Sequence, residues 1–367
     1  MRRKLFLSFN ALALMAYAMS LAAAFISPER CWWLAFAGLA FPILVVALML
    51  IEIPAAIFGS KLFFVNALVL ALSWPVIQKV FNISFSSSNQ KKVWLTVLTY
   101  NVKNFDLYNW SGNLQTRRKI FDLLKAQHAD VLCFQEFYTD PVAHPNLEYL
   151  RDSLQYPFVY FKPSYAYIYS NENEQKRPLS WGLAIFSRYP IVDSGYVTLQ
   201  KNESGQCIFA GLNVGGQRLR VYNTHLHSVH LDYDDYDTLD ELRETQNTQW
   251  TRVRNILRKL RRANRKRALQ AEIIAAHIRR YKQPRLLCGD FNDVPVSYAA
   301  HRIGANLRDA FCDAGSGIGN TFANPIGFFR IDYVLYDPSL RAASYACIRQ
   351  PLSDHYPVKV ELYQKEN

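Results

Sequence analysis

An uncharged apolar run from Leu5 to Ile26 sets the first limit on how this chain folds, because it is long enough to cross a lipid bilayer. A second apolar run covers residues 31–51, with two tryptophans near its start, and a third covers about residues 62–80. The third run is shorter and contains an asparagine and a proline, so it could cross the bilayer or lie in its interface. The sequence therefore predicts that residues 1–81 form a transmembrane anchor with two or three spans. A cleaved signal peptide fits less well, because a second apolar run follows directly.

Basic residues predict the orientation of this anchor. Arg2, Arg3 and Lys4 precede the first run, and the positive-inside rule keeps such a cluster in the cytoplasm. Three spans would place the rest of the chain outside the membrane, whereas two spans would leave it in the cytoplasm. We favour three spans, and therefore expect a multi-pass protein of the bacterial inner (cell) membrane whose remaining domain is periplasmic.

The rest of the chain is predicted to be a linker and one further domain. Residues 82–92 are polar and serine-rich, as in a linker, and residues 93–367 are long enough to bury a large core. Short β-rich runs in this domain predict buried strands, whereas residues 116–127 and about 239–280 show helical periodicity. Many strands, few helices and a hairpin signal at Gly215-Gly216 predict a mixed α/β fold with much antiparallel pairing. The predicted strands are residues 93–101, 130–134, 183–186, 207–214, 219–223, 285–288, 331–336 and 357–362.

The chain carries an excess of basic residues, with a formal net charge of +12. Such an excess favours an anionic partner, for example nucleic acid, phospholipid headgroups or a phosphorylated small molecule. Many of the cations lie between Arg252 and Arg280, where apolar residues recur at helical spacing. Two interpretations stay open for this helix: a solvated outer face, or an electrostatic guide for DNA, RNA or anionic lipid.

Other patterns exclude some functions. The six cysteines are scattered without a close pair, so neither a disulfide framework nor a zinc knuckle is expected. The HExxH pattern of many zinc hydrolases and the Walker sequence of nucleotide-driven proteins are also absent from the sequence. A zinc hydrolase and a nucleotide-driven protein are therefore not expected.

Polar side chains recur where the predicted strands end. Loops at strand ends are free to present side chains to a ligand, so such positions are candidates for a functional site. A single Asn, Asp or His in such a place is usually structural, but several along one chain favour a shared site. The candidates are Asn101, Glu136, Asn223, His225, Asp290, Asn292, Asp332, Asp354 and His355.

The runs around these residues resemble the successive signatures of the endonuclease/exonuclease/phosphatase family, to which deoxyribonuclease I belongs. The runs are TYNV, QEF, GLAIFSRYPI, NTHL, GDFND, RIDYVL and SDHYPV, and they extend over roughly residues 93–362. The resemblance implies a deoxyribonuclease I-like α/β fold, which is a four-layer sandwich of two mixed β-sheets flanked by helices. It also implies hydrolysis of a phosphate ester by an activated water, with one or two Mg²⁺ or Mn²⁺ ions.

The resemblance and the chemistry of the side chains assign roles to the candidates. A hard cation prefers carboxylate oxygen, so Glu136 is the expected principal metal ligand, with Asn101 and Asp354 as further metal contacts. The expected catalytic residues are His225, Asp290, Asn292, Asp332 and His355. Among them, Asp290 is expected to deprotonate the attacking water, and Asp332 to fix the tautomer of His355. Asn292 and the two histidines are expected to donate hydrogen bonds to the phosphate.

Three further residues are expected to contact the substrate, each with a structural alternative. Arg188 could reach a phosphate or pair with a surface carboxylate. Asn223 could contact the substrate or only support a loop, and His227 could merely line the mouth of the site.

The sequence as a whole favours a membrane-anchored, metal-dependent phosphodiester hydrolase, with a nuclease as the leading interpretation. A phospholipase C-like or inositol-phosphate phosphatase activity at the membrane is the first alternative. A non-catalytic membrane binding protein that retains the fold is the second alternative, although every expected catalytic residue type is present.

Overall fold

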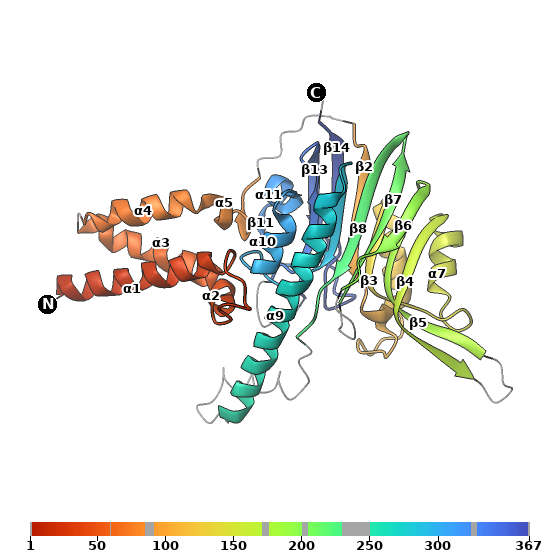
Figure 1. The fold of residues 1–367 in the computed structure, drawn as a ribbon, viewed down its shortest axis with the longest axis horizontal. Helices are drawn as coiled ribbons and strands as arrows, with labels where there is room; N and C mark the ends of the chain where they lie inside the picture. The colour runs from red at the N-terminus through yellow and green to blue at the C-terminus, as the bar shows by residue number, and fades with distance from the viewer. Residues whose placement is uncertain are drawn as a thin grey trace. The chain divides into compact units, whose positions relative to one another are not determined.

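The computed structural model describes residues 2–58, 60–84, 92–170, 176–199, 205–229, 250–323 and 329–365 (Figure 1). The chain divides into two compact units. The first, called the helical unit below, contains Met1–Ile77, His227–Glu272 and Asn292–Ile303. The second, called the sheet unit, contains Gln78–Leu226, Ile273–Phe291 and Gly304–Asn367. The helix α9 (Trp250–Arg280) therefore begins in the helical unit and ends in the sheet unit.

The apolar runs at the N-terminus fold into helices. These are α1 (Arg2–Ala22), α2 (Leu34–Leu39), α3 (Phe41–Ile57), α4 (Leu62–Leu72) and α5 (Trp74–Ile77). Among the described residues, one helix is long and apolar enough to cross a membrane, over Leu5–Ala22 of α1, and α3 and α4 are apolar but shorter. Two or three transmembrane helices are therefore not confirmed. The second and third runs are each divided, at Ala40 and at Ser73, and this division shortens their helices.

These helices bury two asparagines among apolar side chains and leave many other large apolar side chains exposed. Asn10 and Asn66 are fully buried, and their side-chain amides have no hydrogen-bond partner among the described residues. Large apolar side chains on the same helices face outward, and Leu5, Ile43 and Phe64 are 72–73% exposed. A helix bundle in water shows the opposite arrangement, whereas apolar surroundings favour this one.

Two six-stranded sheets form most of the sheet unit (Figure 1). The first sheet has the order β13-β14-β2-β3-β5-β4, and the second has the order β10-β12-β9-β8-β7-β6. The strands of the first sheet are β13 (Leu340–Cys347), β14 (Val358–Gln364), β2 (Leu95–Asn101), β3 (Val131–Thr139), β5 (Lys176–Ser187) and β4 (Phe158–Ser170). Those of the second are β10 (Arg308–Asp309), β12 (Asp332–Tyr336), β9 (Arg285–Asp290), β8 (Gln217–His225), β7 (Gln206–Val214) and β6 (Ile191–Tyr196). One central pair in each sheet is parallel, β2–β3 and β8–β9, and the other pairs are antiparallel.

A core of apolar side chains from both sheets fills the space between them. It contains Val97 and Val131 of the first sheet together with Ile208 and Leu286 of the second, all fully buried. Burial of side chains of this size stabilises a fold by about 1.5–3 kcal/mol each. The apolar runs that predicted buried strands therefore hold the two sheets face to face.

Helices cover the outer faces of the sheets. Because side chains alternate along a strand, Leu98 of β2 faces away from the core between the sheets, and it packs in a second apolar cluster with Ile120 of α6 (Thr116–Gln127). On the second sheet, His277 in the last turns of α9 contacts the rings of Tyr222 and Phe209. The mixed two-sheet α/β fold expected from the sequence is therefore confirmed. The shorter helical segments are α7 (Asn146–Glu148), the π-turn η2 (Tyr149–Ser153), α10 (Tyr298–Gly304) and α11 (Ala310–Ala314).

Some elements differ from the sequence prediction. The helix over residues 116–127 and the turn at Gly215-Gly216 occur as predicted. β4, β6 and β13 were not predicted, and most of their side chains are half-exposed or exposed. The start of the predicted helix 239–280 lies outside the described residues, and the described part, α9, begins at Trp250.

The chain is held firmly where it enters the sheet unit. β1 (Phe81–Asn82) pairs with β11 (Gly317–Ile318). The side-chain amide nitrogen of Asn82 lies 2.8–2.9 Å from the carbonyl oxygens of Phe311, Cys312 and Gly315, and so satisfies carbonyls at the end of α11. The predicted linker, residues 82–92, thus begins with a residue packed on the sheet unit, and its residues 85–91 lie outside the described residues.

A buried arginine strengthens this entry point. Arg330 is 3% exposed, pairs with Asp309 through both terminal nitrogens at 2.7 and 3.0 Å, and donates to the carbonyl oxygen of Lys79. We expect Arg330→Met to lower the free energy of unfolding by about 3–5 kcal/mol, because it removes the buried cation that pairs with Asp309 and leaves this carboxylate with only the backbone N–H of Phe311 as a partner among the described residues. Denaturant unfolding of the chain in detergent micelles measures this change.

A suitable control is Arg341→Met, because Arg341 is only half-buried and donates to nearby backbone carbonyls. This control should change the free energy of unfolding by less than about 1 kcal/mol. Equal effects of the two substitutions would show that the Arg330–Asp309 pair does not secure the fold.

Candidate functional site

The central strands of both sheets end at one place and carry polar side chains there. In the second sheet, His225 at the end of β8 pairs in register with Asp290 at the end of β9, and Asp290 pairs with Asp332 of β12. Register partners on neighbouring strands point to the same face of a sheet, so these three side chains form a row. In the first sheet, Asn101 ends β2, and Glu136 follows the residue of β3 that pairs with Asn101.

The close approach of β8 and β9 requires a glycine. Gly289, directly before Asp290, has a φ of 143°, and a Cβ atom there would lie 1.9 Å from the carbonyl oxygen of Thr224. Any other residue would therefore push the two strands apart. The glycine of the GDFND run is what allows His225 and Asp290 to meet.

The carboxylate of Asp290 lies at the centre of the site. Its Oδ2 accepts a hydrogen bond from Asn101 Nδ2 at 3.1 Å, and lies 3.5 Å from His225 Nε2 and 3.6 Å from His355 Nε2. Asn101 Nδ2 also donates to Glu136 Oε1, 3.1 Å away. Because Asp290 is 1% exposed, its charge must be balanced by these neighbours or by a cation rather than by water.

His355 and Asp332 form a buried pair beside Asp290. His355 Nδ1 lies 2.9 Å from Asp332 Oδ2, and the backbone N–H of Asp332 donates to Thr321 Oγ1. Burial lowers the pKa of His355, but the charges of Asp332 and Asp290 outweigh this effect and raise the pKa to about 10. His355 is therefore protonated on both ring nitrogens at neutral pH. Its Nδ1 donates to Asp332, and its Nε2–H faces Asp290.

Glu136 lies on a β-bulge. The pairing of β3 with β5 shifts register between Phe134 and Phe137, and Glu136 within this bulge has a φ of 51°. A left-handed φ costs a residue with a side chain about 1–2 kcal/mol. Bulges near functional sites turn a side chain in a new direction. Here the turn brings Glu136 Oε1 to Asn101 and to within 4.0 Å of His225 Nε2.

Asn101 also holds the loops around the site. Its Oδ1 accepts the backbone N–H of Lys103, and its backbone oxygen accepts the hydroxyl of Ser353. Lys103 Nζ in turn lies 2.9 Å from Asp354 Oδ2. Burial raises the pKa of Asp354, but the charges of His355 and Lys103 outweigh it and hold the pKa below its usual range. Asp354 is therefore ionised and bound to a lysine at the edge of the site.

The backbone after Asn101 forms a left-handed turn. The residues of η1 (Lys103–Asp106) all have φ between 43° and 59°, a conformation that costs about 1–2 kcal/mol per residue. Phe105 in this turn is buried, with its ring 5.4 Å from the rings of Phe121 and Phe137. Burial of this ring offsets part of the strain and fixes the turn beside the site.

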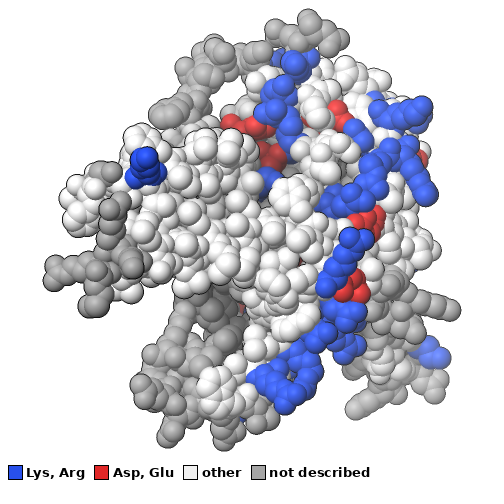
Figure 2. All heavy atoms as spheres, turned by 60° about the vertical axis from the view of Figure 1, so that its left-hand side comes forward, with Lys and Arg blue, Asp and Glu red and all other residues white. Residues whose placement is uncertain are grey.

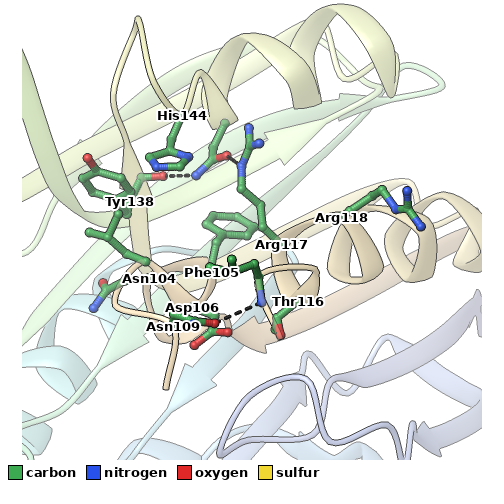
Figure 3. A pocket seen from close by; sticks show the side chains of 12 residues that line it. Asn104, Phe105, Asp106, Asn109, Thr116, Arg117, Arg118, Tyr138 and His144 are labelled. Carbon is green, nitrogen blue, oxygen red and sulfur yellow. Dashed lines mark hydrogen bonds between the residues drawn. The ribbon is translucent and has the colours of Figure 1, made fainter. Parts of the chain in front are cut away.

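A pocket of about 220 Å³ lies where β2 and β3 end. Two residues that line it are close in sequence to residues of the site: Asn104 comes three residues after Asn101, and Tyr138 comes two residues after Glu136. Figure 3 shows polar side chains around it, including Arg117 from α6, whose Nε donates to the side chain of Asn146. Asn101, Glu136 and Asp290 do not line the pocket, which lies beyond the ends of these two strands of the first sheet.

The donor atoms of the site suit a divalent cation. Ligand atoms of Asp290, Asp332 and His355 lie within 4.8 Å of one another. Oxygen atoms of Glu136 and Asp290 also converge on Asn101 Nδ2. Carboxylates this close repel one another unless positive charge lies between them, and Mg²⁺ and Mn²⁺ prefer such oxygen ligands. These carboxylates can therefore hold a cation, but the close cluster consists of Asp290, Asp332 and His355 rather than of the predicted ligands Asn101, Glu136 and Asp354, whose roles stay predictions.

Arg188 is not brought to this site. β5 runs antiparallel to β3, and Ser187 pairs with Val131 at the start of β3, whereas Glu136 lies five residues further along. At about 3.3 Å per residue, this spacing separates the two positions by roughly 16 Å along the strand. Arg188 instead lies over the ring of Tyr156, at 5.1 Å. The antiparallel pairing thus places Arg188 beside the start of β3, at the opposite end from Glu136, and its expected substrate contact stays a prediction.

Asn223 connects the two sheets. It is fully buried, its Nδ2 donates to the carbonyl oxygens of Phe134 and Ala184, and its Oδ1 accepts from Gln135 Nε2 at 2.6 Å. Both Nδ2 and Oδ1 of Asn223 are thus hydrogen-bonded to residues of the first sheet. These contacts favour the structural alternative for Asn223, and its expected substrate contact stays a prediction.

The remaining predicted residues, His227 and Asn292, belong to the helical unit. The backbone of His227 is bound by the side chains of Gln270 and Arg267 of α9. Asn292 directly follows Phe291 at the end of the GDFND strand and has a φ of 51°, which an asparagine tolerates well. Their expected roles stay predictions.

Other residues of the site were not expected from the sequence. Gln135 lies within the QEF run, in which only its neighbour Glu136 was assigned a role. No sequence pattern marks Lys103 or Thr321. Lys103 contacts Asp354, and Thr321 accepts the backbone N–H of Asp332, so each contact joins residues that are not neighbours in the sequence. Gln135 was the one that the motif itself could have revealed.

Two known domain families match most of the chain. The model of the Endonuclease/Exonuclease/phosphatase family matches residues 98–355, and a domain of unknown function (DUF8431) matches residues 3–80. None of the curated proteins compared with the chain matches it.

Solved structures share the fold. An endonuclease/exonuclease/phosphatase from Beutenbergia cavernae DSM 12333 is 19% identical, with a TM-score of 0.52 over 74% of this chain and 72% of that chain. The catalytic domain of human Nocturnin, solved with a bound sulfate anion, is 18% identical, with a TM-score of 0.52 over 75% of this chain and 95% of that chain.

The structural role of Asn223 can be tested by stability. We expect Asn223→Leu, which keeps the size of the side chain, to lower the free energy of unfolding by about 2–3 kcal/mol, because Gln135 and two backbone carbonyls lose their buried partner. Asn213→Leu on the exposed end of the same hairpin is the control, with an expected change below about 1 kcal/mol. Thermal or denaturant unfolding measures both. A stable Asn223→Leu variant would contradict the structural role.

Proposed function

This chain belongs to the endonuclease/exonuclease/phosphatase family, and we propose that it is a metal-dependent hydrolase that cleaves phosphodiester bonds through an activated water. Members of the family hydrolyse phosphoester bonds. The observation that carries the proposal is the convergence of Asn101, His225 and His355 on one oxygen atom of the buried Asp290 carboxylate. A carboxylate held in this way can accept a proton from a water that attacks phosphorus.

The histidines act as donors in this proposal. His355 carries a proton on Nε2, and Asp332 holds its ring, so the charged imidazole of His355 can stabilise negative charge on a phosphate oxygen. His225, 3.5 Å from Asp290 on the neighbouring strand, faces the same atom and can donate to the phosphate from the β8 side. Asn292, two residues after Asp290, is the proposed further donor to the phosphate.

Glu136, Asn101 and Asp354 are the proposed ligands of the cation. Glu136 offers a carboxylate that is 36% exposed at the edge of the buried cluster, where a hydrated Mg²⁺ or Mn²⁺ could keep some of its waters. The bound ion would supply Lewis-acid polarisation of a phosphoryl oxygen and lower the pKa of a bound water. Binding there requires Asn101 Oδ1 to give up the backbone N–H of Lys103, and Asp354 Oδ2 to give up Lys103 Nζ.

For the substrate, we propose a nucleic acid as the leading class. The pocket beyond the ends of β2 and β3 would accept part of the group that the phosphate carries, and its Asn104, Asn109 and Arg117 offer both donors and acceptors. Nocturnin holds a sulfate anion in its structure, and sulfate has the tetrahedral shape of a phosphate. A second candidate substrate is a phospholipid or inositol phosphate, and the apolar N-terminal helices favour it because they would hold the enzyme at a bilayer.

We further propose that α1, α3 and α4 all cross the cell membrane. The support is their surface, because apolar side chains face outward while Asn10 and Asn66 are buried without partners among the described residues. Both oxygens of Glu52 on α3 are likewise buried without a partner among those residues. Polar groups of this kind inside apolar helices are typical of membrane proteins. With the basic N-terminus in the cytoplasm, three passes place the rest of the chain on the periplasmic side.

The catalytic proposal predicts that Asp290→Asn lowers turnover by at least about 1,000-fold, because the amide cannot accept a proton while the hydrogen bond from Asn101 can persist. Turnover is measured with Mg²⁺ on plasmid DNA, single-stranded DNA, sphingomyelin and a chromogenic phosphodiester, which also separates the substrate classes. EDTA should abolish turnover, and added Mg²⁺ or Mn²⁺ should restore it.

The matched control is Asp152→Asn, which removes an exposed carboxylate paired with Arg151 and should leave turnover unchanged. Circular dichroism confirms that both variants are folded. Full turnover in Asp290→Asn, or turnover that EDTA does not affect, would refute the mechanism, and no turnover on any substrate would favour a binding protein.

The membrane proposal predicts the position of the C-terminus. A phosphatase reporter fused after Asn367, which is active only outside the cytoplasm, should be active, and a fluorescent reporter that folds in the cytoplasm should stay dark. The opposite result would mean an even number of spans. Release of the chain by alkaline carbonate would mean that it is not embedded at all.

A further inference from the structure

The basic helix α9 is fixed to the end of the first apolar helix. Arg265 Nε and Nη2 donate to the two carboxylate oxygens of Glu29 at 2.9 and 2.7 Å, and the guanidinium of Arg261 lies 4.9 Å from the ring of Trp32. Glu29 and Trp32 both lie in the turn between α1 and α2. These contacts fall within the helical unit, which includes α9 up to Glu272. The N-terminal part of α9 is therefore attached to the apolar helices at one defined level.

A stripe of arginines extends from this attachment along α9. Arg254, Arg258, Arg261 or Arg262, and Arg265 recur every three or four residues, which is the spacing of one face of a helix. Arg254, Arg258 and Arg262 are exposed and form no ion pair with another described residue. Figure 2 shows Lys and Arg side chains in a band along this helix. From Arg254 to Arg265 the stripe covers about 16 Å of helix.

The side of α9 away from this stripe is buried. Ile256, Ala263 and Arg267 are at most 5% exposed, and Arg267 pairs with Asp293 and donates to the carbonyl oxygen of His227. The packing of α9 is therefore satisfied by its other face. Arg254, Arg258 and Arg262 form no ion pair with another described residue, and the hydrogen bond of Arg258 to Asn255 stays within α9, so these three guanidinium groups are available to an anionic partner.

The position of the stripe favours lipid over nucleic acid. The turn that holds α9 contains Trp32 and the exposed Trp33, and tryptophans mark the boundary between hydrocarbon and water in membrane proteins. A further tryptophan, Trp250, is 85% exposed at the start of α9. Basic side chains at this boundary meet the phosphates of the headgroups, whereas Trp250 is the one Trp, Tyr or Phe of α9, so this helix offers few rings on which bases could stack.

We propose that the face of α9 that carries Arg254, Arg258 and Arg262 binds anionic phospholipid headgroups of the bilayer that contains α1. The binding is electrostatic, through guanidinium groups to headgroup phosphates. It would hold α9 along the membrane surface and set the level at which the chain leaves the bilayer. This inference rests on the proposed membrane placement, and it does not depend on catalysis.

The test uses the full chain in phosphatidylcholine nanodiscs with spin-labelled lipids. Electron paramagnetic resonance gives the preference of the chain for phosphatidylglycerol over phosphatidylcholine. The triple substitution R254Q/R258Q/R262Q should lower this preference at least about threefold, since each basic residue at a membrane surface contributes about a fivefold change in affinity. Salt at about 0.5 M should lower the preference of the unsubstituted chain toward that of the variant.

The matched control is K119Q/K125Q/K365Q, which removes the same charge from exposed positions of the sheet unit and should keep the preference. An unchanged preference in the arginine variant, or an equal loss in the control, would overturn the proposal. The proposal would also be overturned if the arginine variant kept the lipid preference but lost binding of a fluorescent single-stranded oligonucleotide, because the partner would then be nucleic acid.

Two readouts on the same discs separate this inference from the proposed function. Turnover of a chromogenic phosphodiester should be equal in the arginine variant and the unsubstituted chain, which also shows that the variant is folded. Absent turnover with an intact lipid preference would refute the hydrolase and support the lipid-binding face. Release of the unsubstituted chain from bilayers by alkaline carbonate would overturn both the membrane placement and this inference.

Discussion

The negative charge of Asp290, buried between two sheets, is the constraint on which the rest of the site depends. A carboxylate in such a place is tolerated only if donors or cations surround it. The fold meets this requirement from both sheets, with Asn101 from the first and His225 from the second, and with His355 from the segment before β14. Gly289 makes the arrangement possible, because it allows β8 and β9 to approach closely enough for register partners to touch.

Strain around the site is compensated by packing beside it. Glu136 adopts a left-handed backbone on a bulge, and the residues of η1 form a left-handed turn. Each such residue costs about 1–2 kcal/mol. The rings of Phe105, Phe134 and Phe137 lie together directly under these two segments and are fully buried or nearly so. The aromatic cluster of the first sheet thus supports the strained conformation that directs Glu136 toward Asn101.

The sequence predicted the parts of this site that depend on local pattern. Apolar runs that end in Asn, Glu, His or Asp gave the strands and their polar ends, and Asn101, Glu136, His225, Asp290, Asp332 and His355 do converge. Properties that depend on pairing between distant strands were not predictable in the same way. Arg188 and Asp290 both lie within runs that resemble the family. The antiparallel register of β5, however, places Arg188 at the other end of β3. Asn223 shows that a motif marks a required residue without telling whether substrate or scaffold requires it.

The N-terminal helices show why length alone is a poor measure of a membrane span. α1 has 21 residues, or about 31 Å, which matches the hydrocarbon thickness of about 30 Å. α4 has 11 residues and falls short, but α5 continues it after one residue, so that the stretch from Leu62 to Ile77 reaches about 24 Å. A bilayer can thin by a few ångströms at modest cost, whereas water cannot solvate the outward apolar side chains of all three helices without a large penalty. The exposed apolar surface of these helices is therefore what supports the proposal of three passes, whereas helix length supports only α1 as a span.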